Sequence, residues 1–191
     1  MKSFNLLITI AIALTHLQAN CQTVDYYTGR TFAEGRFINY RIANDKNSVV
    51  VSNENNRIIG SPILWLDTGE YAMAETRPGA VRDDKTIRRI VRKVFTRKEI
   101  RKYTRSKNNI EIGVAIDPHT GKTIEVDFTI TDYDAFNDPV LLSIPITKLE
   151  QMEQLFKEEL VWGINPRSEN ASYIGLSITL FWNKKRGPFL L

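Results

Sequence analysis

The chain has 191 residues and a formal net charge of +4, and its single cysteine, Cys21, excludes both an internal disulfide and a cysteine-based metal site. The length is sufficient for one domain with a sizeable core. The sequence contains no nucleophile elbow, phosphate-binding loop, dinucleotide fingerprint or H-E-x-x-H zinc motif, so no common catalytic signature applies and we expect no cofactor.

The N-terminus has the layout of a secretory signal peptide. Lys2 supplies a positive charge, the nine residues 6–14 include one polar member, and residues 15–19 end in the small residue Ala19. A membrane span needs about 20 apolar residues, so this run is too short for an anchor. We therefore predict that residues 1–21 are a signal peptide and that residues 22–191 form one exported α+β domain. A buried N-terminal strand or helix is the alternative.

Three ways of processing this segment are compatible with the sequence. Cleavage after Ala19 or after Cys21 fits the preference for small residues, whereas lipid attachment would make Cys21 the new N-terminus. The residues before Cys21 are Gln18, Ala19 and Asn20, and two of them depart from the lipoprotein pattern. We therefore expect a soluble periplasmic or secreted form rather than a protein lipidated at Cys21.

Residues 22–80 are predicted to form the N-terminal strands. Apolar and polar residues alternate over 38–42, a turn cluster follows at 44–47, and 48–52 returns with three consecutive valines. A third piece, 58–66, is interrupted by Gly60-Ser61-Pro62, which predicts a bend or a sheet edge. Residues 69–75 are a further candidate strand, and Pro78-Gly79 marks the change to helix.

Residues 84–106 are predicted to form two helices. Apolar residues at helical spacing define one buried stripe: Ile87, Ile90, Val91, Val94 and Phe95. Thr96 and Glu99 then have the spacing of a capping box, in which each side chain serves backbone N–H groups at a helix start. Phe95 and Ile100 stand at the positions of the hydrophobic staple around that box. A second helix is therefore expected to begin at Thr96, with a single kinked helix as the alternative.

A β-hairpin is predicted over residues 110–130. Apolar and polar residues alternate over 110–116 and 124–130, around a turn in which Pro118 and Gly121 suit a type I turn with a bulge. Residues 133–143 are expected to be a loop. Thr147 and Glu150 have the spacing of a second capping box, which opens a helix that Gly163 ends. Alternation over 174–182 predicts a last strand, followed by a basic tail at 184–186.

This order of helix, hairpin, helix and strand over about 84–182, with the turn Asp117-Pro118-His119-Thr120-Gly121 in the hairpin, resembles the C-terminal domain of TonB. The resemblance implies an antiparallel sheet packed by helices, whose edge strand takes up a short transporter segment. The sequence lacks the Tyr-Pro pair, membrane anchor and Pro-rich spacer of that family, so energy transduction is not implied. The export signal, length and element order also resemble the small exported proteins of unknown function of Bacteroidetes-type bacteria.

The edge of the predicted sheet is the main candidate for partner binding. We expect residues 110–116 and 174–182 to pair antiparallel, with the second strand of the hairpin on the far side. A two-stranded hairpin is marginally stable alone, so we favour docking of strands from 36–66 along the outer side of 173–182. If that side is free instead, it suits an extended segment of a periplasmic or outer-membrane protein.

Candidate chemical sites are few. His119 lies on the hairpin turn, where a lone histidine is typically solvated. Four acidic residues share the outward parity of the hairpin, and we favour a solvated acidic face over a cation site: Glu111, Asp117, Glu125 and Asp127. The cluster Asp132, Asp134 and Asp138 lacks the spacing of a calcium loop. We predict no catalytic residue and no metal site.

A basic helix face is the strongest charge feature. Residues 82–107 contain twelve Lys or Arg and three Asp or Glu. The basic face lies opposite the apolar stripe and consists of Lys85, Arg88, Arg89, Arg92 and Lys93. We favour a solvated face, followed by binding of anionic lipid or acidic polysaccharide. Two basic helices also suggest a helix-turn-helix, but export argues against nucleic acid as the partner.

The sequence therefore favours a non-enzymatic interaction or structural module of the cell envelope. The alternative is a periplasmic enzyme that uses carboxylates, or a protein that binds carbohydrate or an anionic surface. A deep pocket lined by Asp or Glu would favour the alternative, and a shallow surface would favour the module.

Overall fold

The protein is described by a computed structural model, which covers residues 25–72, 79–103, 106, 108–131, 140–183 and 187–190. Its centre is a seven-stranded sheet in the order β1-β2-β3-β6-β5-β8-β9. Each neighbouring pair is antiparallel. In chain order the strands are β1 (Phe32–Glu34), β2 (Asn39–Asp45), β3 (Ser48–Asn53), β5 (Asn109–Ile116), β6 (Thr123–Thr131), β8 (Ile174–Asn183) and β9 (Gly187–Leu190). The predicted α+β fold with an antiparallel sheet is confirmed.

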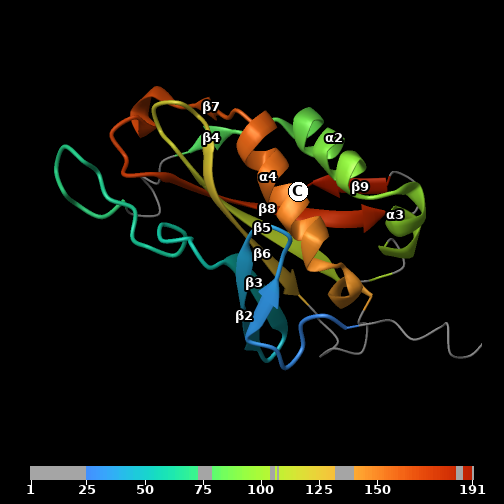
Figure 1. Ribbon diagram of the computed structural model, residues 1–191. Helices are drawn as coiled ribbons and strands as arrows, with labels where there is room; N and C mark the ends of the chain where they lie inside the picture. Colours follow the sequence, from blue (N-terminus) through green and yellow to red (C-terminus); the bar gives the residue numbers. More distant parts are fainter. Residues whose placement is uncertain are drawn as a thin grey trace, which may run out of the picture.

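Three helices lie on one face of this sheet: α2 (Asp84–Val94), α3 (Arg97–Tyr103) and α4 (Ile146–Glu159) (Figure 1). Two short 3-10 turns, η2 (Leu141–Ser143) and η3 (Pro166–Ser168), flank α4 in the sequence. A separate two-stranded ribbon joins β4 (Ala80–Val81) to β7 (Gly163–Ile164). Within the described part of the chain, no helix is both long and apolar enough to cross a membrane.

The main core lies between the helices and the sheet. Ile110, Ile112 and Ile116 of β5 are fully buried, whereas Glu111 between them is exposed, as strand periodicity requires. The opposite face of the sheet, here called the open face, carries none of the three described helices. One end of it is covered by the loop after β3, through a small cluster of Ile63, Ala115, Ala171 and Tyr173.

The predicted break between the first two helices is confirmed. Phe95 is extended, and Thr96 and Glu99 form the capping box: Glu99 Oε2 accepts from Thr96 N at 2.7 Å, and Thr96 Oγ1 accepts from Glu99 N at 3.2 Å. The apolar stripe of α2 is buried as expected. Phe95 is buried and Ile100 packs against the same core, as a staple requires.

The predicted hairpin is also confirmed, together with its bulge. β5 pairs with β6 along its length, and the register shifts between Ala115 and Ile116. Asp117 accepts from the backbone N–H groups of His119 and Thr120, each at 2.8 Å, which closes the turn. Gly121 follows with a φ of +67°, a conformation that favours glycine.

The N-terminal strands dock at a different edge from the one expected. β3 pairs with β6, so the strands within 36–66 extend the hairpin side of the sheet rather than the β8 side. The expected pairing of 110–116 with 174–182 is confirmed. Val49 and Val51 are fully buried opposite Ile130 and Phe128 of β6, and this burial favours pairing with that strand.

The third piece, 58–66, has the bend predicted at residues 60–62 but no regular strand, and within it only isolated bridges form, Leu64 with Tyr71 and Trp65 with Ala171. Gly60 has a φ of +87°, which breaks any regular strand at that point. Residues 69–72 of the candidate strand 69–75 belong to the same loop, and the remainder lies outside the described residues. The basic tail 184–186 lies outside them as well.

Two predictions about α4 are wrong. The helix begins at Ile146, Pro145 is its N-cap, and no side chain caps it, so Thr147 and Glu150 do not form a capping box. The helix also ends at Glu159 and not at Gly163, which belongs to β7. Leu160 and Trp162 are buried while Val161 is exposed, and this alternation requires an extended backbone.

Candidate functional site

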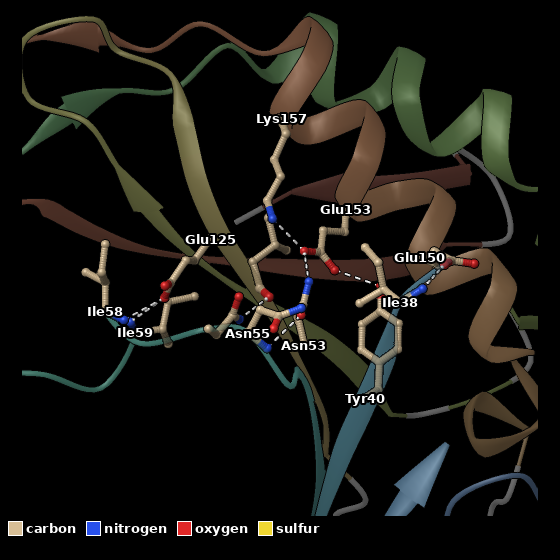
Figure 2. Close-up of polar contacts among 12 residues, drawn as sticks. Ile38, Tyr40, Asn53, Asn55, Ile58, Ile59, Glu125, Glu150, Glu153 and Lys157 are labelled. Carbon is tan, nitrogen blue, oxygen red and sulfur yellow. Dashed lines mark hydrogen bonds and ion pairs between the residues drawn. The ribbon is translucent and has the colours of Figure 1, made fainter. Parts of the chain in front are cut away.

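A buried carboxylate on α4 forms the centre of one polar network. Glu153 is fully buried and accepts from Tyr40 Oη at 2.7 Å, Asn53 Nδ2 at 2.8 Å and Lys157 Nζ at 2.7 Å. Figure 2 shows these three donors, two from the N-terminal strands and one from the next turn of α4, converging on it. Burial and the neighbouring Glu153 carboxylate raise the pKa of Tyr40 far above its ordinary value, so its hydroxyl remains a donor.

Two further glutamates hold loops through backbone N–H groups. Glu150 accepts from the N–H of Arg36 at 2.7 Å, Phe37 at 2.6 Å and Ile38 at 2.9 Å. Glu125 accepts from the N–H groups of the three residues 57–59, at 2.6–2.8 Å. Each carboxylate fills a concave set of backbone donors, which otherwise would suit an anionic ligand.

Glu150 and Glu153 also line a cavity, and their hydrogen bonds indicate what role they can have there. A cavity of about 360 Å³ is lined by Phe37, Ile38, Glu150, Glu153, Gln154, Lys157 and Glu158. Both oxygens of Glu150 and of Glu153 already accept hydrogen bonds from the protein. Neither side chain is therefore placed to exchange a proton with a substrate, and the arrangement favours a structural role.

The outer side of β8 differs from the rest of the sheet. β9 pairs only with Leu180–Asn183, and Pro188, which has no N–H, lies opposite Trp182. This pair therefore exchanges no reciprocal hydrogen bonds, and the adjacent Phe181 is the residue that bonds to β9. By alternation, the N–H and C=O groups of Gly175, Ser177 and Thr179 point to the same outer side. No strand of the described chain pairs with them there.

A cavity of about 420 Å³, here called the edge groove, adjoins this unpaired segment. Gly113 and Val114 of β5 line it together with Gly175, Leu176 and Ser177 of β8. The opposing wall is formed by residues 59–63, Tyr71, Ala72 and Tyr173. The Tyr173 hydroxyl donates to the Ser61 carbonyl and thereby ties the wall to the start of β8.

Two carboxylates lie on the open face beside the edge groove. A Cβ added at Gly113 would lie 2.1 Å from Asp127 Oδ1, so the Asp127 side chain occupies the space above that glycine. Burial, with Glu111 and Glu125 nearby, raises the pKa of Asp127 against the opposing effect of the Gly113 backbone. The Ser177 hydroxyl donates to the Glu111 carboxylate, which places that charge next to the outer strand.

The predicted acidic face is therefore only partly solvated. Glu111 is exposed, Asp117 closes the turn and Asp127 is half-buried, but Glu125 is buried under the loop that it holds. His119 is exposed on the turn. Among the residues that the structure describes, no three His, Cys, Asp or Glu side chains gather as metal ligands would. Asp132, Asp134 and Asp138, and Cys21, lie outside the described residues.

The structure divides the basic face into two sides. All five residues are exposed, but Arg89 and Lys93 turn toward α4 and share Glu159, at 3.5 Å and 2.7 Å. Arg88 lies 3.8 Å from Asp84 on its own helix. Lys85 and Arg92 form no ion pair with any described residue.

Sequence reasoning missed the roles of the three buried glutamates, Glu125, Glu150 and Glu153, and it missed the edge groove. The sequence gave no usable signal for these roles, because Glu150 and Glu153 lie 100 residues or more along the chain from their partners in the N-terminal segment. The sequence does contain a signal for the edge groove. Gly113, Gly175 and Ser177 occupy outward positions of two strands that were predicted to pair, where small side chains leave room that the Asp127 side chain fills above Gly113.

Comparison with known proteins gives a family but no activity. A family model described as a domain of unknown function (DUF5043) matches residues 22–178. The crystal structure of a DUF5043 family protein from Bacteroides uniformis ATCC 8492 is similar, with a TM-score of 0.68 and 19% identity, and the match covers 85% of this chain and 98% of that chain. At this identity the likeness shows the fold alone. No curated protein matches the chain.

Proposed function

We propose that this chain, which belongs to the DUF5043 family of domains of unknown function, is a non-enzymatic interaction module that binds a short extended peptide along β8. The observation that carries the proposal is that no described strand pairs with the outer side of Gly175, Ser177 and Thr179. An unpaired strand edge offers N–H and C=O groups at strand spacing, which is how peptides are taken up by strand addition.

The size of the open segment sets the length of the peptide. Residues 175–179 extend over about 17 Å at about 3.3 Å per residue. Beyond Thr179 the same side of β8 is taken by β9, from Leu180 onward. A bound segment of about five residues therefore fits between β9 and the loop that carries Tyr71, and a longer one would have to leave the plane of the sheet.

The saturation of the buried glutamates supports a binding role over the carboxylate-dependent enzyme that the sequence left open. Glu150 and Glu153 line a cavity but have their oxygens occupied by protein donors. A general acid or base must be within reach of the proton that it transfers.

The proposed location is the bacterial cell envelope, outside the cytoplasm, and it rests on the N-terminal sequence pattern. Mass spectrometry of protein from its native host is expected to find a mature N-terminus between Asn20 and Gln22. An intact Met1 on the folded protein would contradict export, and acyl chains on Cys21 would identify a lipoprotein.

Strand addition can be tested with two proline variants that differ by one position. The N–H of Ser177 points outward, so Ser177→Pro removes a donor from the open edge and spares the backbone hydrogen bonds to β5, although it also removes the hydroxyl that donates to Glu111. The N–H of Ile178 points to β5, so Ile178→Pro breaks the sheet itself.

The binding assay uses a displayed library of random seven-residue peptides. Selected peptides should bind the wild type and protect the amides of residues 175–179 from hydrogen exchange. Ser177→Pro should keep the fold and lose binding, and Ile178→Pro should lose both. Selected peptides that bind Ser177→Pro as tightly as the wild type would overturn the proposal.

A second candidate function is attachment to an anionic surface through α2. Lys85 and Arg92, with Arg88 between them, lie at i, i+3 and i+7 on its solvent side. Vesicles with an anionic lipid should bind the protein at low salt and release it at high salt. Charge reversal at these three positions should abolish binding, whereas reversal at Arg89 and Lys93, which already pair with Glu159, should weaken it less. Binding that is absent at low salt would leave the face merely solvated.

A further inference from the structure

The floor of the edge groove carries little side-chain bulk around Gly175. Gly175 has no side chain and Ser177 has a small one, whereas the Asp127 side chain occupies the space above Gly113. A Cβ added at Gly175 would lie 3.4 Å from Tyr173 Cε2 and 3.5 Å from Ile63 Cδ1, which are ordinary contact distances. The apolar wall therefore stands within van der Waals reach of the space above Gly175.

A strand added to β8 would place one side chain in that space. Paired residues on neighbouring strands point to the same face of a sheet, so the residue opposite Gly175 points to the open face. A glycine on an edge strand leaves a cross-strand gap that an aromatic partner covers best. Tyr71 and Tyr173 in the wall are aromatic themselves, and aromatic side chains pair favourably with one another.

The position opposite Ser177 lies in a different electrostatic setting. The Ser177 hydroxyl holds the Glu111 carboxylate, and the Asp127 carboxylate covers the adjacent Gly113. The described residues that line the edge groove include no Lys or Arg. A peptide side chain that lies opposite Ser177 on the open face is therefore close to two carboxylates and to no basic residue of the groove. A basic side chain at this position of the peptide would complement that negative charge.

We infer that the ligand of the edge groove is a peptide with a basic residue opposite Ser177 and an aromatic residue opposite Gly175, a deduction that rests on the proposed strand addition. Every strand pair of the sheet is antiparallel, and antiparallel pairing is the slightly more stable mode. In that direction the peptide meets Ser177 before Gly175. The recognised pattern is therefore basic-x-aromatic, with the basic residue on the N-terminal side.

The test uses four synthetic peptides, all of seven residues and otherwise threonine. The probe has arginine at its third position and tyrosine at its fifth. One variant replaces the tyrosine with alanine, one replaces the arginine with glutamate, and one exchanges the two residues. Fluorescence anisotropy against the full-length protein is expected to show a loss of about tenfold or more for alanine. The glutamate variant should lose about fivefold at low salt, and the exchanged order should also bind more weakly.

Protein variants connect the preference to the groove. Gly175→Val fills the floor and is compatible with a strand, so it should bind the tyrosine and alanine peptides equally while its melting temperature is retained. Tyr71→Ala, an exposed wall residue, is a second variant that leaves the core untouched and should weaken the tyrosine peptide alone. Glu111→Gln should weaken the preference for arginine, because it removes one of the two carboxylates that lie beside this position.

The outcomes separate this inference from the proposed function. If all four peptides bind equally and Ser177→Pro abolishes their binding, strand addition stands and the basic-x-aromatic pattern is overturned. If the exchanged peptide binds best, the direction is parallel and the stated order is overturned. If none of the four binds and no library peptide depends on Ser177, both the inference and the proposed function fail.

Discussion

The three N–H groups that Glu150 binds should make it one of the most sensitive surface-loop anchors in the protein. Glu150→Ala removes acceptors from Arg36, Phe37 and Ile38, at 2.7, 2.6 and 2.9 Å. A hydrogen bond to a charged group contributes about 1.5–3 kcal/mol, so three would total about 4.5–9 kcal/mol. Arg36 and Phe37 are exposed, and water can replace part of that loss. We therefore expect a decrease of about 2–4 kcal/mol in the free energy of unfolding, or about 5–15 °C in Tm.

Two companion variants separate this anchor from the helix cap that the sequence suggested. Oε1 accepts from both Phe37 and Ile38, so the amide oxygen of Glu150→Gln can retain two of the three bonds, and the loss should be about half. A true capping box would make Thr147→Ala cost about 1 kcal/mol, but α4 has no side-chain cap, so we expect less than about 0.5 kcal/mol.

The assay is equilibrium unfolding in urea followed by circular dichroism, with Glu169→Gln, an exposed glutamate, as the matched control. A loss below about 0.5 kcal/mol for Glu150→Ala would refute the reasoning. So would a Thr147→Ala loss as large as that of Glu150→Ala, since it would restore the capping interpretation.

Three further predictions use the same unfolding measurement. Thr96→Ala should cost about 1 kcal/mol because the Glu99 amide loses its cap, and no measurable change would contradict the role of the box. Gly121→Ala should cost about 2–4 kcal/mol, since its φ is +67° and the new Cβ would meet Trp162 O at 2.3 Å, whereas Gly69→Ala, with φ +71° and open space, should cost about 1 kcal/mol. Equal losses at the two glycines would disprove the steric part of the argument. Because burial raises the pKa of Asp127, the folded protein binds that proton up to a higher pH than the unfolded chain, and stability decreases as pH rises through the folded pKa. Asp127→Asn should therefore stabilise the protein at pH 7, with a gain that disappears below the ordinary carboxyl pKa of 3.8; a destabilised variant at pH 7 would reverse the sign.

The two proposed functions depend on different kinds of interaction, since peptide binding at β8 uses backbone groups and surface attachment through α2 uses side-chain charge. Strand addition depends on backbone groups, so most side-chain changes on β8 should modulate it and only proline at an outward position should remove it. Attachment through α2 depends on exposed charge and should respond to salt. The two mechanisms use separate elements, and each can be removed without the other.

The sequence by itself determined the local elements, because their signals depend on residues that are close along the chain. Alternation predicted the hairpin and the last strand, and the spacing of Thr96 and Glu99 predicted the break between α2 and α3, where the expected hydrogen bonds are found. The antiparallel pairing of β5 with β8 followed from two clean alternations. In each case one side chain and its near neighbours carry the information.

Only the tertiary structure decided which edge each strand takes and what each glutamate binds. Thr147 and Glu150 have the same spacing as Thr96 and Glu99, yet Glu150 binds a turn 112–114 residues away. The N-terminal strands have an alternation that fits either edge, and the burial of Val49 and Val51 beside β6 selects one of them. A local pattern indicates only what a residue can bind among its neighbours in the sequence. In the folded chain, a carboxylate binds the donors that packing brings to it. A strand edge pairs with the strand that buries the most apolar surface.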